Sequence, residues 1–301
     1  MRSASPVLRP GRDGALLVPD LAYPRAFTLR VGRTDQSYVD LDDPLRLEFD
    51  YMQRLVDVLD SVSEPGQRLR VVHIGGAAMT LPRYVAATRP TSAQIVLEPD
   101  TELTAFVRQY LPLPTRSGIK VRGVDGRRGI AELHDGYADL VIIDAFVGAR
   151  VPAELTTATF LADARRALND HGVIMINLTD RGPLAYARRV LAGVRAAFPH
   201  ALLCAESSTL KGRRFGNVII VGSAAPLPYA AIAERAGRSP FPYRVLRGAR
   251  LSQLLADSVP FGDEDAEESP EPGSAMRPSN LTGAASAQLA QGIQPADRLI
   301  E

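Results

Sequence analysis

The sequence contains few of the residues from which redox and metal centres are built. Of its 301 residues, one is cysteine, four are histidine and none is tryptophan. A single cysteine excludes an internal disulfide, and no group of cysteine and histidine residues has metal-site spacing, so we expect no bound metal. The cysteine, Cys204, stands in the apolar run ALLCAES, which predicts a buried and inert thiol.

The sequence also lacks an excess of charge and a long apolar run. The formal net charge is +1, so the composition does not predict a nucleic-acid partner. No run is long enough to span a bilayer, and the opening MRSASPVLRPGRDG lacks the apolar core of a signal peptide. We therefore expect a cytoplasmic protein with no membrane partner, whose 46% apolar residues suffice for a packed core.

Three regions follow from the distribution of residue types. Residues 1–60 combine short β-like runs, RAFTLRVG and QSYVDL, with a stretch from Leu45 to Leu59 whose apolar residues have helical spacing. Residues 61–260 alternate apolar strand-like runs with helical segments and end in an irregular apolar part, 225–260, for which we expect covering helices. Residues 261–301 begin with an acidic, proline-rich stretch, which predicts a largely disordered tail.

The central region predicts an α/β fold with a doubly wound, mostly parallel, seven-stranded sheet of the Rossmann-like type. The first strands are continuous apolar runs, as parallel strands covered on both faces require. The last two, ALLCAES and FGNVIIVGS, are joined only by STLKGRR, which is too short for a helical crossover and predicts an antiparallel hairpin. Helices are expected at 80–89, 101–110, 127–134, 156–168 and 183–198, with Thr156 or Thr157 as a cap and Pro183 in a first turn.

The candidate site residues stand where successive predicted strands end. Ligands of open α/β sheets bind outside the carboxyl ends of the strands. The ends in question are Gly75-Gly76, Glu98, Asp125-Gly126 and Asp144. Glycine at 75 and 76 lets the backbone approach a ligand closely. Glu98, about twenty residues later, is suited to accept from ribose hydroxyls, and Asp125 to accept from an exocyclic amine. The missing lysine and third glycine argue against a triphosphate or pyrophosphate ligand.

Structural explanations compete with these functional ones. The glycine pair alone is also typical of a tight turn, and Glu98 and Asp125 both precede helices that they are able to cap. We favour the functional interpretation because the acids occur together at matched strand ends.

These motifs, taken in order, make residues 34–223 resemble the spermidine synthases, which are polyamine aminopropyltransferases with the class I methyltransferase fold. DQSYVDL, EFDYMQRL, IGGAAMTLPR, VLEPD, GVDGRRGI and DLVIIDAFVG each resemble a family motif. The resemblance implies an S-adenosylmethionine or decarboxylated S-adenosylmethionine cofactor near Gln36, Gly75, Gly76, Glu98, Asp125, Gly126 and Asp144. It further implies Asp144 as the base, Tyr51 beside a small-molecule acceptor, and a homodimer.

The departures from the family motifs concentrate on the acceptor side. The glycine-loop Asp of the family is Ala78 here, the second Asp of the D-S-[ST]-D-P run is Val147, and the His of its YHE motif is Met52. Both lost acids hold the cationic amine in the family, and an ammonium buried without an anion is costly. We therefore expect an acceptor other than a simple diamine.

The loop STLKGRR supplies a clue to that acceptor. Its Lys211, Arg213 and Arg214 emerge at the carboxyl edge, so they indicate either an acceptor with an anionic group or a solvated hairpin tip. Three further functions stay open: a methyltransferase, because Ala78 no longer repels a cofactor carboxylate; a silent nucleoside-binding protein; and, against the missing third glycine, an NAD-dependent enzyme.

Overall fold

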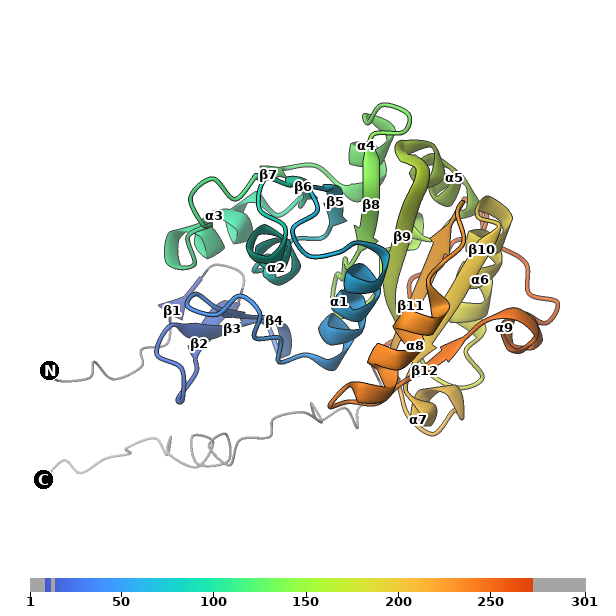
Figure 1. Ribbon diagram of the computed structural model, residues 1–301. Coiled ribbons are helices and arrows are strands. Elements are labelled where there is room, and N and C mark those ends of the chain that lie inside the picture. The colour runs from blue at the N-terminus through green and yellow to red at the C-terminus, as the bar shows by residue number, and fades with distance from the viewer. Residues whose placement is uncertain (1–8, 12–13, 273–301) are drawn as a thin grey trace, which may run out of the picture.

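The N-terminal part of the chain forms a small antiparallel sheet. The computed structural model describes residues 9–11 and 14–272 (Figure 1). Within them the small sheet has the order β1-β2-β3-β4. Its strands are β1 (Arg9–Pro10), β2 (Ala15–Pro19), β3 (Ala26–Val31) and β4 (Thr34–Asp40).

The large sheet carries the predicted α/β fold. Its order is β12-β10-β11-β9-β8-β5-β6-β7, in which β7, β6, β5, β8 and β9 are parallel and β11 and β12 are antiparallel to their neighbours. The strands are β5 (Arg70–Ile74), β6 (Ala93–Leu97), β7 (Ile119–Arg122), β8 (Ala138–Ile143), β9 (Leu168–Asp180), β10 (His200–Ala205), β11 (Gly216–Ser223) and β12 (Arg244–Leu246). The predicted β10–β11 hairpin is confirmed.

Helices cover both faces of the large sheet (Figure 1). One apolar cluster joins one face to α1, α2 and α8, and another joins the opposite face to α4, α5, α6 and α9. The helices are α1 (Asp50–Val62), α2 (Thr80–Thr88), α3 (Thr101–Tyr110), α4 (Gly126–Ala131), the 3₁₀ helix η1 (Ala153–Leu155), α5 (Ala158–Ala167), α6 (Ala185–Ala197), α7 (Ser207–Leu210), α8 (Tyr229–Arg238) and α9 (Gly248–Leu255). No helix of the described part meets the length and apolarity that a bilayer crossing requires.

The alternation of side chains along the strands decides which residues face α1. In β8, Leu140 and Ile142 join the cluster under α1, whereas Val141 and Ile143 join the opposite one. Because successive side chains of a strand alternate between faces, the next residue, Asp144, falls on the α1 side. The strand thus delivers a carboxylate to that side of the carboxyl edge.

The small sheet packs against α3 and the glycine turn. Leu17, Leu29 and Val39 form one apolar cluster with Val107 of α3 and with Ala78, which follows the glycine pair. The N-terminal sheet is therefore fixed beside the turn, and this places β4 next to the candidate site.

Several elements differ from the predictions. The stretch 225–260 contains a short strand, β12, besides its helices, so the sheet has eight strands where seven were predicted. Helix α1 begins at Asp50, and Leu45 is 53% exposed before it. Pro183 lies outside α6, which begins at Ala185 after the cap Leu184, whereas the predicted Thr157 cap of α5 is confirmed by its bond from the Phe160 amide.

The acidic segment was predicted to be disordered from residue 261, and for residues 261–272 this is wrong. Phe261 is 1% exposed and its carbonyl accepts from the Ala158 amide at 2.8 Å. Ser269 is buried, and its hydroxyl accepts from the Val151 amide at 2.9 Å. Asp263, Asp265 and Glu268 pair with Arg127, Arg189 and Arg150. Residues 273–301, the rest of the predicted tail, lie outside the described residues.

Candidate functional site

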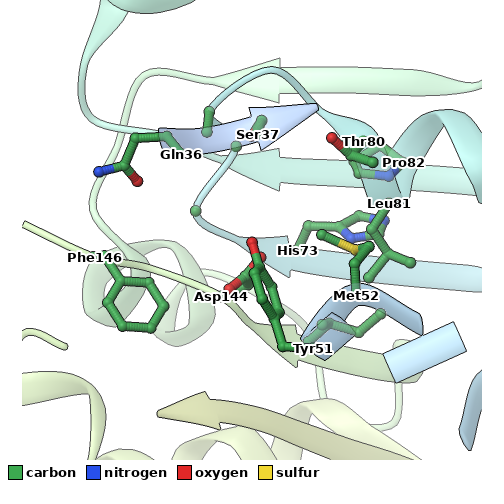
Figure 2. A pocket seen from close by; sticks show the side chains of 14 residues that line it. Gln36, Ser37, Tyr51, Met52, His73, Thr80, Leu81, Pro82, Asp144 and Phe146 are labelled. Carbon is green, nitrogen blue, oxygen red and sulfur yellow. The ribbon is translucent and has the colours of Figure 1, made fainter. Parts of the chain in front are cut away.

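A pocket opens at the carboxyl ends of β5 and β8, between α1, β4 and the glycine turn. Its enclosed space is small, about 40 Å³, and the empty volume reaches about 470 Å³ when the open mouth is included. Figure 2 shows Tyr51 and Asp144 between a pair at one end, Gln36 and Phe146, and a group at the other that includes Met52 and His73. The lining residues are Gln36, Ser37, Tyr51, Met52, His73, Gly75, Gly76, Ala77, Thr80, Leu81, Pro82, Ile142, Asp144 and Phe146.

The glycine turn brings β5 close to the loop after β8. Gly75 has φ +89°, and a Cβ there would lie 2.3 Å from the Asp144 carbonyl oxygen. No other residue type fits this approach, so the first glycine is required by the packing of the chain itself. Gly76 lines the pocket and donates its amide to the Glu98 Oε2 at 2.8 Å. The tight-turn explanation therefore holds for Gly75, although both glycines line the pocket.

Glu98, after β6, is bound to the glycine turn. Its Oε2 accepts from the Gly76 amide and, at 3.4 Å, from the Ala77 amide, and its Oε1 accepts from the Asp100 amide at 3.0 Å. Asp100, rather than Glu98, caps α3. A carboxylate has about four acceptor positions, so partly exposed Glu98 retains capacity for a ligand hydroxyl. Glu98 does not itself line the pocket.

Asp125 and Gly126 serve the fold in the positions where the structure has them. Asp125 caps α4, because its Oδ1 accepts from the Arg128 amide at 2.9 Å. Gly126 is buried, and a Cβ there would lie 2.3 Å from Cγ2 of Ile74. Neither residue lines the pocket, so the capping explanation describes Asp125 and a packing explanation describes Gly126.

Asp144 is the one carboxylate among the residues that line the pocket. Its residue surface is only partly buried, but the protein around its carboxyl group raises the pKa to about 6 by burial. The Asn177 amide donates to its Oδ1 at 2.8 Å and opposes that rise by stabilising the charged form. A group with this pKa is largely ionised at neutral pH and titrates near it, which suits a general base.

The side chain of Asn177 is itself held in place by a second side-chain amide, that of Asn217. Asn217 of β11 donates from Nδ2 to the Asn177 Oδ1 at 3.0 Å, so the Nδ2 of Asn177 is left to face Asp144. Asp144, Asn177 and Asn217 follow or belong to the neighbouring strands β8, β9 and β11, on the side that faces α1. Together they form an amide row that orients the carboxylate.

The sequence contains a signal for this amide row, which the strand-end motifs do not include. Asn177 is 0% exposed and interrupts the apolar run GVIMIN, and Asn217 begins the apolar run of the next paired strand. A buried amide needs hydrogen-bond partners, so its presence in such a run indicates a polar neighbour on the same face. His73, Met52 and Phe146 were not predicted as lining residues either, because apolar and aromatic positions in strands and loops are usual core positions.

Tyr51 lies in the pocket as the family resemblance implied. Burial raises the pKa of its hydroxyl well above the ordinary value, and the negative charges of Asp144 and Asp50 raise it further. Its helix is fixed to the sheet by Arg54, which is 1% exposed and pairs with Asp50 at 2.5 Å and with Glu206 at 3.1 Å. Tyr51 therefore stays a neutral hydroxyl beside Asp144.

Gln36 of β4 lines one end of the pocket, and it comes from the small sheet (Figure 2). The neighbouring Ser37 is buried, and its hydroxyl accepts from the Ala78 amide at 3.3 Å. This bond fixes the strand to the glycine turn. The small sheet thereby contributes a side-chain amide to a pocket that otherwise belongs to the large sheet.

The three cations of the loop after β10 do not line this pocket. Lys211 lines a separate cavity, and Arg214 pairs with Glu206 at 3.4 Å. Arg213 is exposed. Where the structure has them, the hairpin-tip explanation describes Arg213 and Arg214, and no contact links the loop cations to Asp144.

The two positions where the family has acids also point away from the pocket. Ala78 is 0% exposed within the apolar cluster of Leu17, Leu29 and Val39. Val147 is 67% exposed, in a turn closed by backbone bonds with Arg150. An acid at residue 78 would therefore enter an apolar cluster rather than the pocket.

The site has features that fit an adenosyl ligand in part. A half-glycine turn, a strand-end carboxylate with spare acceptor capacity and an adjoining pocket are present. Asp125 caps α4 through its Oδ1 and lies outside the pocket lining, so the adenine contact predicted for it stays a prediction. Within residues 9–11 and 14–272, no group of three His, Cys, Asp or Glu side chains has the arrangement of a metal site.

Comparison with known proteins finds similar enzymes over part of the chain. No protein-family model matches. The polyamine aminopropyltransferase of Chromobacterium violaceum is 27% identical over 145 residues, which are 48% of this chain and 54% of that protein. The enzyme of the same name from Vibrio vulnificus is 27% identical over 156 residues, or 50% and 51%. The chain thus spans about half the length of these curated relatives.

Solved structures match more of the chain. The crystal structure of a probable spermidine synthase from Corynebacterium glutamicum has a TM-score of 0.78 and 25% identity, and the match covers 91% of this chain and 100% of that one. Human methyltransferase-like protein 13 in complex with SAH has a TM-score of 0.52 and 21% identity, over 71% and 96%. The second likeness shows a shared methyltransferase fold.

Proposed function

We propose that this chain, which is spermidine synthase-like in sequence and fold, is a transferase that binds an adenosyl sulfonium cofactor in the Asp144 pocket. The observation that carries the proposal is the oriented carboxylate. Asp144 is held by the Asn177 amide beside the glycine turn, and its pKa of about 6 suits the acceptance of a proton at neutral pH. An aspartate that only supported the fold would not have to face a pocket, whereas Asp144 lines one.

Each residue of the site has a task in such a transfer. The Oδ2 of Asp144 would take the proton that the acceptor amine loses as its nitrogen bonds to carbon and the carbon–sulfur bond of the sulfonium breaks, releasing a neutral thioether. Tyr51, a neutral hydroxyl, is placed to hydrogen-bond the acceptor. Gly76 lines the pocket, and Glu98, which accepts from the Gly76 amide just outside the lining, would accept from ribose hydroxyls. When bound, the sulfonium supplies an electrophilic carbon, so the protein's work is orientation and proton removal.

The acceptor is expected to be something other than a simple diamine. A diamine brings two ammonium groups, and Asp144 is the one acid that lines the pocket. The second ammonium would lose its hydration without an anionic partner, which costs several kcal/mol in practice. The group transferred is aminopropyl or a related one, in keeping with the aminopropyltransferase names of the relatives.

Methyl transfer is the second candidate, because the glycine turn carries no acid. Residues 75–78 are Gly-Gly-Ala-Ala, so a cofactor that keeps its own carboxylate meets no negative charge on that turn. Both candidates place the base at Asp144 and differ in the cofactor.

Product analysis distinguishes these functions. The protein is incubated with each cofactor and a panel of amine acceptors, and the nucleoside product is identified by mass spectrometry. We expect methylthioadenosine from the decarboxylated cofactor, and S-adenosylhomocysteine would instead indicate methyl transfer. Neither product with any acceptor, despite tight cofactor binding, would mean a silent nucleoside-binding protein and would contradict the proposal. Brisk turnover of putrescine would overturn the acceptor argument.

A further inference from the structure

A second cavity lies between α7, α8, β12 and α9, and it shares no lining residue with the Asp144 pocket. Its volume is about 600 Å³, which is ample for a small organic ligand. The transferase proposal makes no use of it. The lining residues are Ser207, Leu210, Lys211, Tyr229, Ala233, Ala236, Gly237, Tyr243, Arg244, Val245, Leu246 and Arg250.

The cavity gathers positive charge and has no acid in its lining. Lys211, Arg244 and Arg250 line it. Within the part of the chain that the structure describes, none of the three has an ion-pair partner, and Arg244 donates only from Nε, to the Ser207 hydroxyl at 3.3 Å. A further guanidinium, that of Arg247, lies 3.6 Å over the ring of the lining residue Tyr229.

Three arginines nearby, outside the lining, have ion-pair partners. On α8, Arg238 pairs with Glu234 at 2.7 Å and Arg235 pairs with Asp60 at 3.7 Å. On the loop after α7, Arg214 pairs with Glu206 at 3.4 Å. The lining cations are thus unpaired although paired arginines occur on neighbouring segments. Cations gathered without acids repel one another, and an anion between them removes that repulsion.

Apolar walls strengthen the field inside the cavity. Leu210, Ala233, Ala236 and Leu246 belong to the lining, and Tyr243 beneath them is 5% exposed. Low-dielectric walls concentrate the field of the charges that rim them. The cavity therefore combines a cationic rim with a surface on which the organic part of a ligand can pack.

We propose that this cavity binds the phosphate group of a small phosphorylated metabolite. Guanidinium groups match phosphate oxygens with paired N–H donors, and the Lys211 ammonium adds a mobile point charge. A volume of about 600 Å³ exceeds what one phosphate needs, so the ligand carries an organic body against the apolar walls. The site is independent of the transferase proposal and stands whether or not that proposal does.

The test is calorimetric titration of the full chain at low salt with ribose 5-phosphate, pyrophosphate and inorganic phosphate. Ribose is the phosphate-free control, and none of the probes carries the adenosyl group expected in the Asp144 pocket. We expect ribose 5-phosphate to bind with a dissociation constant below about 1 mM. Affinity should fall as salt rises, because the exposed cations become screened. Comparable binding of ribose, or no binding of any phosphate probe, would overturn the proposal.

Variants locate the binding on the chain. The double variant Arg244→Gln with Arg250→Gln should weaken ribose 5-phosphate at least tenfold, and Lys211→Gln should weaken it less. The matched control is Arg238→Gln, an exposed arginine of α8 that is paired outside the cavity, and it should leave the affinity unchanged. Lys211, Arg244 and Arg250 are all exposed, so these variants should keep the wild-type midpoint of thermal unfolding. Phosphate binding that survives the double variant would refute this assignment.

Discussion

At the scale of single residues, Asp144 is a carboxylate kept in an environment that favours its neutral form. Burial raises its pKa to about 6, and the Asn177 amide keeps the charged form accessible. Ionisation of Asp144 at neutral pH therefore lowers the free energy of unfolding. A raised folded-state pKa contributes stability that is fully present below the unfolded value near 4 and is lost as the pH rises through 6. Because the ionised Asp144 lowers stability and lies in a pocket, we infer that its charge serves the function of the pocket.

The first prediction concerns Asp144→Asn. Transfer should fall by about 10²–10⁴-fold, the range attributed to a general base. The folded state should be more stable than wild type above pH 6 and about equal below pH 4, since only the charged form is unfavourable. Initial rates and urea unfolding at both pH values check this. The matched control, Asp170→Asn at an exposed position, should change neither, and undiminished transfer in Asp144→Asn would remove the residue from the mechanism.

The second prediction concerns the amide row. Asn177→Leu keeps the branched shape and the number of side-chain heavy atoms but removes the donor that stabilises the Asp144 anion, so the Asp144 pKa should rise above its value of about 6. The rate of transfer should rise with pH through about 6 in the wild type and at a higher pH in the variant. The measurement is the pH dependence of kcat/KM, with the rate at high pH showing whether the variant is folded. An unshifted profile would mean that Asn177 supports the strand and not the base.

Residue-level reasoning from the sequence led to Asp144, Gly75 and Gly76, and the family resemblance added Tyr51; all four line the pocket. It also led to Asp125, which caps α4 and lies outside the pocket lining, because strand-end acids look alike until the direction of the next backbone amides is known. Asp125 accepts from the Arg128 amide and so caps α4. In α3 the Leu103 amide donates to Asp100 instead, so Glu98 is not used as a cap and accepts from the glycine turn. Hydrogen-bond partners that lie across strands are not encoded in local spacing.

At the scale of elements, the acidic segment 261–272 acts as a strap across α5, α6 and the loop after Asp144. Phe261 packs on Tyr186 and under Arg189, with 3.9 Å between the guanidinium and the ring centre. Composition predicted disorder because few apolar residues are present. The prediction failed because the segment buries its one phenylalanine, and because three arginines distant in sequence pair with its acids.

The third prediction tests the strap. Phe261→Ala should lower the free energy of unfolding by about 3–5 kcal/mol, the usual cost of emptying a buried aromatic site. Val259→Ala, two residues away and 64% exposed, is the control and should change it by about 0.5 kcal/mol or less. Urea unfolding provides the comparison. Equal stability of the two variants would show that the strap does not contribute to the core.

Short elements were the hardest to predict. The strand β12 has three residues, Arg244–Leu246, and pairs with β10 through contacts that its own sequence does not indicate. Long strands such as β8, with a continuous apolar run, were predicted within a few residues. Length and periodicity carry the signal, and a three-residue strand has too little of either.

At the scale of the whole molecule, the predicted resemblance to spermidine synthases is confirmed by curated relatives and by a solved structure covering 91% of the chain. The mostly parallel sheet, its antiparallel hairpin and the position of the pocket at the carboxyl edge follow from the alternation of strands and helices along the sequence. The packing of the small sheet on the glycine turn does not, and it buries Ala78 where the family resemblance suggested an open site. Restoring an acid at residue 78 is therefore expected to destabilise the fold rather than to recruit an amine.

The central claim is that the Asp144 pocket binds an adenosyl ligand with help from Glu98, and titration calorimetry with methylthioadenosine tests it most directly. We expect saturable binding to the full chain. Glu98→Gln should weaken it by about 1.5–3 kcal/mol, the range for hydrogen bonds to a charged group. Asp170→Asn should leave it unchanged. Absence of binding by methylthioadenosine and by both sulfonium cofactors, or wild-type affinity in Glu98→Gln, would contradict the account.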